Sequence, residues 1–403
     1  MTLLASTLDL DVIQQLEHGH QLPLYAKREI ALVRGEGSYL YDSEGKRYLD
    51  AMSNYGVAVL GHADPEFAAA LVDQLGRLTT CHQSFYSDVR ASLLAAIAEI
   101  APDGLTRSFL SNSGAEAIEA GLKFARAATG RPKVVAARRA YHGRTLGALS
   151  ATADAKYRTP FEPLPVNVVH VPFNDADALA AAVDNETAAV ILEPIQGEAG
   201  IFPADDSYLQ AARDLTGARG ALLIADEVQT GFRTGAPFAI ARAGVTPDIL
   251  CTAKALANGF PIGLTLTTDR VSERTGAGVH GTTFGGNPLA CRAALATLTA
   301  LRERGLYARA AELGARLVAG VEGLGSPKIR QVRGRGLMIG IELKERVTPT
   351  LRALQERGVL ALPASPVVFR LLPPLVWQEE QVDEFLGALG AVLASSRRVG
   401  CLD

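Results

Sequence analysis

Short apolar runs alternate with amphipathic stretches through the middle of this 403-residue chain, and this alternation limits the folds open to it. The strand candidates are rich in Val, Ile, Leu and Ala: residues 133–137, 188–193, 221–226 and 248–251. Residues 115–129 and 207–216 have the periodicity of helices. Strands that alternate with helices favour a mostly parallel sheet covered on both faces. We therefore predict an α/β fold.

The two ends of the chain have a different pattern. Residues 30–50 contain short strand-like pieces, residues 337–343 and 367–372 are strand candidates, and residues 379–395 form a closing amphipathic helix. We expect a large domain over residues 65–290. A smaller α+β domain is expected from residues 1–64 and 291–403 together.

Charge and cysteine content exclude several classes of protein. Lys and Arg number 40 and Asp and Glu 43, a net charge of −3, so no global attraction to nucleic acid or to an anionic membrane is expected. The four cysteines are widely spaced, which argues against zinc or disulfide frameworks and favours free thiols. The first basic residue is Lys27, and no apolar run is long enough to span a bilayer. We expect a cytoplasmic protein without a metal site.

Several polar residues follow strand candidates, where open α/β sheets bind their ligands. Ser111-Asn-Ser-Gly-Ala-Glu-Ala117 opens a helix whose first N–H groups suit a phosphate, although a plain helix cap has the same composition. Asp226 ends an apolar strand, where its carboxylate can accept a charge-assisted hydrogen bond or simply lie in a solvated loop.

Lys254 follows the next apolar strand and has apolar neighbours. A desolvated lysine has a lowered pKa and becomes a nucleophile suited to a Schiff base, whereas a surface lysine would extend to water. His280-Gly-Thr-Thr-Phe-Gly-Gly-Asn-Pro288 offers hydroxyl groups to an anion or forms an ordinary turn. Tyr141-His-Gly-Arg144 could stack on a planar ligand and hold a carboxylate.

Two other patterns are weaker. Gly334-Arg-Gly-Leu-Met-Ile-Gly340 is rich in glycine, but we expect neither the preceding strand nor the following helix of a dinucleotide-binding fingerprint. His142 lies near Arg144 without a serine or cysteine elbow, so a hydrolase triad is not supported.

Taken together and in this order, the motifs resemble the class III pyridoxal-phosphate aminotransferases of fold type I. The resemblance runs from about Tyr25 to the last helix. It is carried by the phrases around Ser113, Tyr141, Asp226, Lys254 and Thr282, and by Glu193-Pro-Ile-Gln-Gly-Glu198. Within the class, the chain is similar to the acetylornithine group and to its branch that acts on carrier-protein-linked lysine.

The resemblance implies pyridoxal 5′-phosphate as the cofactor, held as a Schiff base on Lys254. Lys254 would also transfer the proton during catalysis. Asp226 would pair with the pyridine nitrogen, Val228 and Tyr141 would pack on the two ring faces, and Gln229 would bind the phenolic oxygen.

The same resemblance assigns the phosphate to the N–H groups of Gly114 and Ala115, with help from Ser113. Thr283 would reach the phosphate of the neighbouring subunit and Thr282 would lie near substrate. The implied protein is a homodimer with its active site at the interface.

Substrate roles also come from the resemblance. Arg144 would hold the α-carboxylate of the substrate, and Tyr25 is placed as a substrate contact. Glu198 and Arg370 match a pair that closes for the amino donor and opens for 2-oxoglutarate or glutamate. Tyr55 matches ornithine aminotransferases and the carrier-linked branch better than acetylornithine enzymes.

The implied reaction transfers the terminal amino group of an α-N-blocked ornithine or lysine to 2-oxoglutarate, giving the semialdehyde and glutamate in arginine or lysine biosynthesis. The donor would be N2-acetylornithine or carrier-linked γ-glutamyl-lysine. Ornithine or 4-aminobutyrate aminotransferase and a non-catalytic cofactor-binding protein remain alternatives. The basic residues Arg131, Lys133, Arg138 and Arg139 would either meet an acidic carrier protein or form a solvated cluster.

Overall fold

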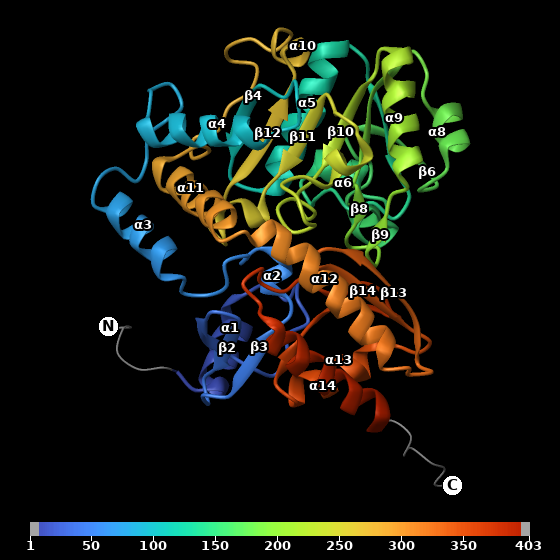
Figure 1. Cartoon of the computed structure of the whole chain (residues 1–403). Coiled ribbons are helices and arrows are strands. Elements are labelled where there is room, and N and C mark those ends of the chain that lie inside the picture. The colour runs from blue at the N-terminus through green and yellow to red at the C-terminus, as the bar shows by residue number, and fades with distance from the viewer. Residues whose placement is uncertain (1–7, 396–403) are drawn as a thin grey trace.

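A seven-stranded sheet forms the centre of the molecule in the computed structural model, which describes residues 8–395. Its strands are β4 (Arg107–Ser111), β5 (Lys133–Ala137), β6 (Asn167–Val171), β7 (Thr187–Leu192), β10 (Leu222–Asp226), β11 (Ile249–Thr252) and β12 (Gly263–Thr267). Their order is β4-β12-β11-β10-β7-β5-β6, and only β12 runs against its neighbours. The predicted α/β fold with a mostly parallel mixed sheet is therefore confirmed (Figure 1).

The central strands are buried on both faces, which explains their continuous apolar sequences. In β5, Val134 and Ala136 pack with α5 (Gly114–Thr129) and α6 (Leu146–Ala151). Val135 belongs to the opposite face, which is covered by α8 (Ala176–Ala182), α9 (Asp206–Arg219), α4 (Asp88–Ile100) and α11 (Pro288–Glu303). Alternate side chains of one strand thus supply two layers of core.

The terminal segments of the chain build two four-stranded sheets. Strands β1 (Leu32–Glu36), β2 (Tyr39–Asp42) and β3 (Arg47–Asp50) form an antiparallel unit, which β15 (Val359–Leu360) extends. Strands β13 (Ile329–Arg335), β14 (Met338–Leu343), β17 (Val368–Leu371) and β16 (Leu362–Pro363) form another. These sheets lie below the large one in Figure 1, with α12 (Leu306–Gly323), α13 (Val347–Glu356) and α14 (Glu379–Ser395) around them.

Most expected elements occur within one or two residues of their predicted bounds, and the helix at 379–395 matches α14. The segment around Gly334 corrects one expectation. A strand, β13, does precede it, because residues 329–335 pair with β14 in an antiparallel hairpin that turns at Gly336. No helix follows, so the segment is a hairpin. The division of the chain into domains at residues 64 and 290 stays a prediction, and residue 290 falls within α11.

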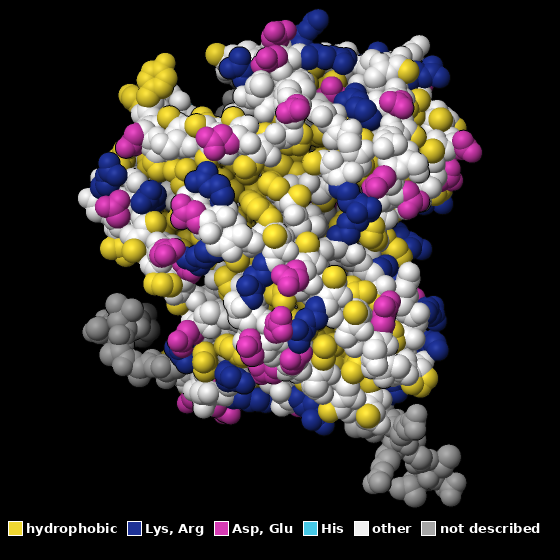
Figure 2. Space-filling view, viewed as in Figure 1, with side chains coloured by type: hydrophobic (Ala, Val, Ile, Leu, Met, Phe, Trp, Pro, Cys, Tyr) yellow, Lys and Arg dark blue, Asp and Glu magenta, His cyan; other side chains and the backbone are white. Residues whose placement is uncertain are grey.

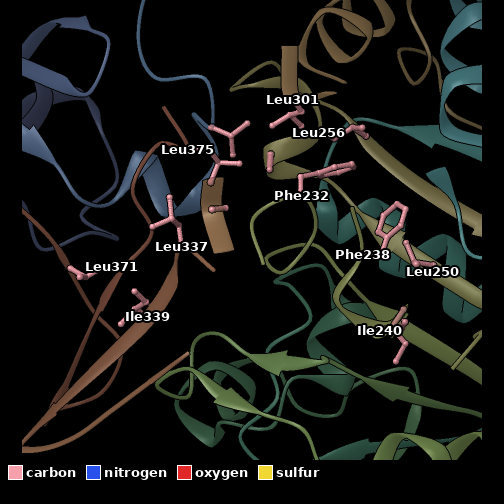
Figure 3. Close-up of a cluster of buried hydrophobic side chains, with 14 of the residues drawn as sticks. Phe232, Phe238, Ile240, Leu250, Leu256, Leu301, Leu337, Ile339, Leu371 and Leu375 are labelled. Atoms are coloured by element: carbon pink, nitrogen blue, oxygen red, sulfur yellow. The ribbon is translucent and has the colours of Figure 1, made fainter. Parts of the chain in front are cut away.

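One hydrophobic core connects the large sheet with the hairpin sheet. Figure 3 shows side chains from both regions within this core: Phe232, Phe238, Ile240, Leu250, Leu256, Leu301, Leu337, Ile339, Leu371 and Leu375. Arg233 is fully buried at the same junction. Its Nη1 donates a hydrogen bond to the Leu337 carbonyl at 2.7 Å, and its Nη2 lies 3.4 Å from Ser53 Oγ. The two regions are therefore joined by apolar packing and by a buried guanidinium.

None of the helices within residues 8–395 combines the length and the apolar character needed to cross a bilayer. Cys81, Cys251 and Cys291 are free thiols, and Cys401 lies outside the described residues, as do the first seven residues considered for a leader.

Gly314 of α12 provides a test of the packing between this helix and the hairpin. A Cβ at Gly314 would overlap the carbonyl oxygen of Gly336. Gly336 has a positive φ of 53° in the turn between β13 and β14. We expect Gly314→Ala to lower the free energy of unfolding by about 1–3 kcal/mol, since neither backbone can yield without strain.

Gly217 of α9 is the matched control, because a Cβ there meets nothing within 4 Å. Gly217→Ala should leave stability unchanged or raise it by up to about 1 kcal/mol through helix propensity. Chemical denaturation of the two variants measures both values. Equal stability of the two variants would contradict the proposed close packing.

Candidate active site

The candidate site lies where five strands of the large sheet end. Ser113, Tyr141, Glu193 and Lys254 follow β4, β5, β7 and β11 in turn, and Asp226 is the last residue of β10. Because β12 runs antiparallel between β4 and β11, these five strands all point the same way. Their carboxyl ends therefore bring residues far apart in the sequence to one edge.

A cavity of about 430 Å³ opens at this edge. Ten of the residues expected in the site line it: Ser113, Gly114, Ala115, Tyr141, Arg144, Glu198, Asp226, Val228, Gln229 and Lys254. Arg370 lies behind the wall and contacts Glu198 and Gln229, which do line the cavity.

The remaining expected residues lie outside this cavity. Tyr25 is 75% exposed and does not line it. Thr282 accepts a hydrogen bond from Asn112 Nδ2 at 3.2 Å, so it lies behind the cavity wall. Thr283 is exposed in the same loop and does not line the cavity. The roles of these three residues stay predictions.

Lys254 begins the short helical turn after β11 with a positive φ of 41°. Loss of water is the main cause of its lowered pKa. The positive charge of Arg370 lowers that pKa further, while the carboxylate of Glu198 acts in the opposite direction. A lysine with a lowered pKa carries a neutral, nucleophilic amine at a lower pH than an ordinary lysine. The alternative of a solvated surface lysine does not fit this position.

Asp226 is almost completely buried at the end of β10 and is paired with His142. Its Oδ2 lies 2.7 Å from His142 Nδ1, and its Oδ1 accepts the N–H of Val228 at 3.0 Å. Burial alone would lower the pKa of His142, but its hydrogen bond with Asp226 and the charges of Asp226 and Glu193 raise it above the ordinary value. The hydrogen bond with His142 fixes the position of the Asp226 carboxylate in the cavity wall.

Glu193 follows β7 and joins two loops of the cavity. Its Oε1 accepts the N–H of Tyr141 at 3.0 Å and its Oε2 accepts the N–H of Gly197 at 3.1 Å. Burial raises the pKa of Glu193 to about 7. In the sequence, Glu193 stood out only as part of a motif. Its place directly after a buried strand, like that of Asp226, was the signal that could have identified it.

Glu198 and Arg370 form an ion pair on the opposite side of the cavity. Arg370 Nη2 lies 2.6 Å from Glu198 Oε1, and Arg370 is fully buried. Gln229 bridges them, because its Oε1 accepts from Arg370 Nη1 and its Nε2 donates to Glu198. Burial alone would raise the pKa of Glu198, but the charges of Arg370 and Lys254 lower it below the ordinary value.

The start of α5 forms the anion-binding wall. Ser113 Oγ accepts the N–H of Glu116 at 3.2 Å, while the Glu116 carboxylate accepts the N–H of Asn112 at 2.8 Å. This reciprocal cap leaves the first-turn N–H groups of Gly114 and Ala115 without partners inside the helix. A Cβ at Gly114 would meet Val228 Cγ1 at 2.6 Å, so only glycine fits beside that side chain.

These groups fit pyridoxal phosphate. The N–H groups at the start of α5 suit a phosphate, the buried Asp226 carboxylate suits a pyridine N–H, and the Lys254 amine suits an aldehyde. Among residues 8–395, no group of three or more His, Cys, Asp or Glu side chains is arranged to hold a metal ion.

Comparison with known proteins agrees with this geometry. The family model for class-III aminotransferases matches residues 24–393. The chain belongs to this family. It therefore shares the aminotransferase activity and the pyridoxal phosphate cofactor of the family, and its fold is fold type I.

Three relatives illustrate this membership. The [LysW]-aminoadipate semialdehyde transaminase of Deinococcus radiodurans is 46% identical over 92% of this chain and 87% of its own length. The acetylornithine aminotransferase of Mycobacterium tuberculosis strain H37Rv is 46% identical, with 93% of this chain and 94% of that protein covered. A structure of the ornithine aminotransferase from Toxoplasma gondii, with pyridoxal phosphate partly occupying its active site, superposes with a TM-score of 0.92. That protein is 32% identical, and the match covers 96% of this chain and 94% of that one.

Glu227 allows a test of how burial changes the pKa of a carboxyl group beside the site. It is fully buried, it accepts a hydrogen bond from the N–H of Ile240 at 2.7 Å, and Thr230 donates to it. Burial raises its pKa from an ordinary 4.5 to about 7. The folded state therefore holds the Glu227 proton more tightly than the unfolded state does.

This stabilisation is complete below about pH 4.5 and is lost as the pH rises through about 7. Glu227→Gln does not titrate. The free energy of unfolding of the wild type minus that of Glu227→Gln should then fall by about 3 kcal/mol between pH 4.5 and pH 8. Denaturation curves across this range measure the difference. A difference that stays constant would contradict the raised pKa.

Proposed function

We propose that this class-III aminotransferase moves the terminal amino group of an α-N-blocked ornithine or lysine to 2-oxoglutarate, giving a semialdehyde and glutamate. The observation that carries the proposal is one cavity in which Lys254 faces both the Asp226–His142 pair and the Glu198–Arg370 pair. The first pair serves chemistry common to all donors. The second pair serves a site that accepts two different substrates.

In this proposal the cofactor is held by residues of four strand ends. Gly114, Ala115 and Ser113 bind its phosphate, and Asp226 binds its ring nitrogen. Tyr141 and Val228 contact its two ring faces, while Gln229 lies near its phenolic oxygen. When bound, pyridoxal phosphate supplies an electron sink for the substrate carbon that loses a proton.

Lys254 moves the proton in both half-reactions. Its Nζ would take a proton from the substrate carbon and deliver it to the aldehyde carbon of the cofactor, which requires a neutral amine. Desolvation favours this neutral form, since it lowers the pKa of Lys254. Asp226 and His142 stay hydrogen-bonded to each other and undergo no net change.

The substrate roles follow from the charges around the cavity. Arg144 has no acidic partner within residues 8–395, so its guanidinium is available to the α-carboxylate of a donor. The terminal amine of the donor has no negative charge for Arg370 to bind. Arg370 therefore stays paired with Glu198 at the end of the cavity where that amine lies. When 2-oxoglutarate enters, Arg370 exchanges Glu198 for the carboxylate beside the reacting carbon, and the distal carboxylate lies at Arg144. Because a buried arginine must keep a partner, the exchange costs little only if the new carboxylate takes the place of Glu198.

The relatives support both blocked donors, since the acetylornithine and [LysW]-aminoadipate semialdehyde enzymes are each 46% identical to this chain. Ornithine or 4-aminobutyrate transfer is the alternative. One observation bears on the choice: the ring of Tyr55, a residue expected in ornithine enzymes and in the carrier-linked branch, lies 5.5 Å from the Arg370 guanidinium carbon. The exposed position of Tyr25 does not add to that alternative.

Lys254→Ala tests the central role of the lysine. The variant should lose steady-state turnover with every donor, because no other amine lines the cavity among the residues described. A wild-type panel of N2-acetylornithine, N2-acetyl-lysine, ornithine and 4-aminobutyrate, followed by cofactor absorbance in single turnovers, assigns the donor.

Fast change with a blocked donor is the expected result. Change only with free ornithine or 4-aminobutyrate would move the assignment to the alternative, and turnover by Lys254→Ala would refute the role of the lysine.

We also propose a homodimer. Exposed apolar side chains occur on and after α3 (Pro65–Leu75) and in two neighbouring loops: Val72, Leu75, Leu78, Phe85, Tyr86 and Phe284. Buried Arg90 connects these loops, since it donates to the carbonyls of Phe85 and Gly286. Figure 2 shows hydrophobic side chains gathered at the surface where α3, α4 and α11 lie. An apolar face of this kind is typical of a subunit interface, and it borders the loop of Thr282 and Thr283.

Phe85→Glu/Phe284→Glu tests the interface. Two buried carboxylates would have no partners there, so the double variant should sediment as a monomer and should bind the cofactor more weakly. Phe161→Glu is the control, because Phe161 is also exposed but lies in the short helix Thr159–Phe161, away from these loops. A double variant that remains a dimer, or a control that dissociates equally, would contradict the proposed face.

Two further parts of the proposal concern the setting of the reaction. A cytoplasmic location suits the free thiols of Cys81, Cys251 and Cys291. An acidic amino-group carrier protein is a candidate partner, because relatives named for LysW are 43–46% identical to this chain.

A further inference from the structure

A second cavity, of about 590 Å³, adjoins the catalytic one. Tyr141 and Glu198 line both, so the two cavities share a wall. The second cavity lies between the loop after β5, the short helix α7 (Ala155–Arg158) and the hairpin of residues 364–366. Its volume is in the range of sites for small molecules and is far larger than an acetyl group requires.

Four basic side chains line this second cavity, which we call the basic cavity: Arg138, Arg139, Lys156 and Arg158. Lys156 pairs with Asp154 at 3.0 Å and Arg158 with Glu162 at 3.6 Å. Arg138 and Arg139 have no acidic partner anywhere in the described part of the chain. The other carboxylate in the wall, Glu198, is already paired with Arg370. The lining therefore has an excess of positive charge.

The other two basic residues singled out from the sequence do not reach this cavity. Lys133 donates to the Ala182 carbonyl at 2.8 Å and pairs with Asp184 at the opposite end of β5. Arg131 donates to the carbonyls of Thr187 and Arg219. Lys133 and Arg131 therefore bind groups of the chain close to them and do not contribute charge to this cavity.

Arg144 connects the two cavities. It lines the catalytic cavity, and its guanidinium carbon lies 3.7 Å from the ring centre of Tyr157, which lines the basic cavity. Its Nε also donates to the hydroxyl of Tyr141, which belongs to both walls, at 3.1 Å. A donor with its terminal amine at Lys254 and its α-carboxylate at Arg144 has its α-nitrogen at this shared wall. Whatever blocks that nitrogen is directed towards the basic cavity.

We propose that the basic cavity binds carboxylates on the group that blocks the α-nitrogen of the amino donor, with Arg138 and Arg139 as the specificity-determining residues. This inference rests on the proposed function, because it takes the role of Arg144 from it. A neutral acetyl group would leave both arginines without a partner. An acidic acyl group, or an acidic segment of a carrier joined through a glutamate side chain, would satisfy them with charge-assisted hydrogen bonds.

The test compares three donors that all contain lysine and differ in the group on its α-nitrogen. The first two are N2-acetyl-lysine and N2-(γ-glutamyl)-lysine. In the third, the α-nitrogen is joined to the side-chain carboxyl of the last glutamate in a short Glu-rich peptide. In the wild type, kcat/KM should be higher for the two acidic donors and should fall as salt is added. In Arg138→Gln/Arg139→Gln, kcat/KM for an acidic donor should fall about tenfold or more, while that for N2-acetyl-lysine should change less than about twofold.

Arg126→Gln/Arg352→Gln is the matched control. Both of these arginines are exposed, neither forms an ion pair among the described residues, and neither lines a cavity. The control removes the same net charge and should leave all three donors unchanged. A selective loss already seen with the γ-glutamyl donor identifies a small acidic acyl group. A selective loss seen only with the peptide donor identifies a carrier segment.

A binding measurement keeps this inference separate from the proposed function. Titration calorimetry with tetraglutamate should show salt-sensitive binding to the wild-type holoenzyme and about tenfold weaker binding to Arg138→Gln/Arg139→Gln. Equal losses with acidic and acetyl donors, or tetraglutamate binding that does not depend on the two arginines, would overturn the basic cavity. If the wild type turns over no blocked donor but tetraglutamate still binds as expected, the proposed function fails while the anion site stands.

Discussion

Parallel strand direction is the constraint on which the site depends. The strands β5, β7, β10 and β11 run the same way, so the chain must return across a face of the sheet after each one. Each return starts from the same edge, and the residue after each strand is left beside the residues after its neighbours. Glu193, Asp226 and Lys254 are separated by dozens of residues in sequence and share one cavity for this reason alone.

Burial gives these groups their chemical properties. Water stabilises charge, and an enclosed site removes that stabilisation, so each ionised group in the cavity needs a partner. Asp226 has His142, and Glu198 has Arg370. No carboxylate among residues 8–395 is hydrogen-bonded to Lys254, and its pKa falls. The site thus separates groups that keep a fixed charge from the one group that must exchange protons.

The sequence predicted the repeating part of this architecture well and its exceptions poorly. Apolar periodicity identified β5 and α14 closely, because both are regular and strongly patterned. It did not identify residues 263–267, which form β12, as a strand, and the reversed direction of a strand leaves no mark on a short buried run. Strand β13 was missed because residues 329–335 are rich in arginine and glycine and become a strand only by pairing with β14.

The site shows the same division. Position after a strand pointed to Asp226 and Lys254 without reference to any relative. The pairing of Glu198 with Arg370 joins a turn residue to a residue of β17 far along the chain, so only the family resemblance suggested it. The sequence does not distinguish Arg138 from Arg131. Only the fold shows that Arg138 lines a cavity, whereas Arg131 donates hydrogen bonds to nearby backbone carbonyls.

Arg233 has a consequence for how the enzyme can adapt to two substrates. Its guanidinium is sealed between the hairpin at Leu337 and the turn at Ser53. Rotating the terminal sheets away from the large sheet would strip this cation of its partners without giving it new ones. Hinge motion at this junction is therefore expensive, and adaptation must occur by exchange of side-chain partners inside a rigid frame. Such an enzyme accommodates its second substrate by a change of side-chain rotamer rather than by a domain movement.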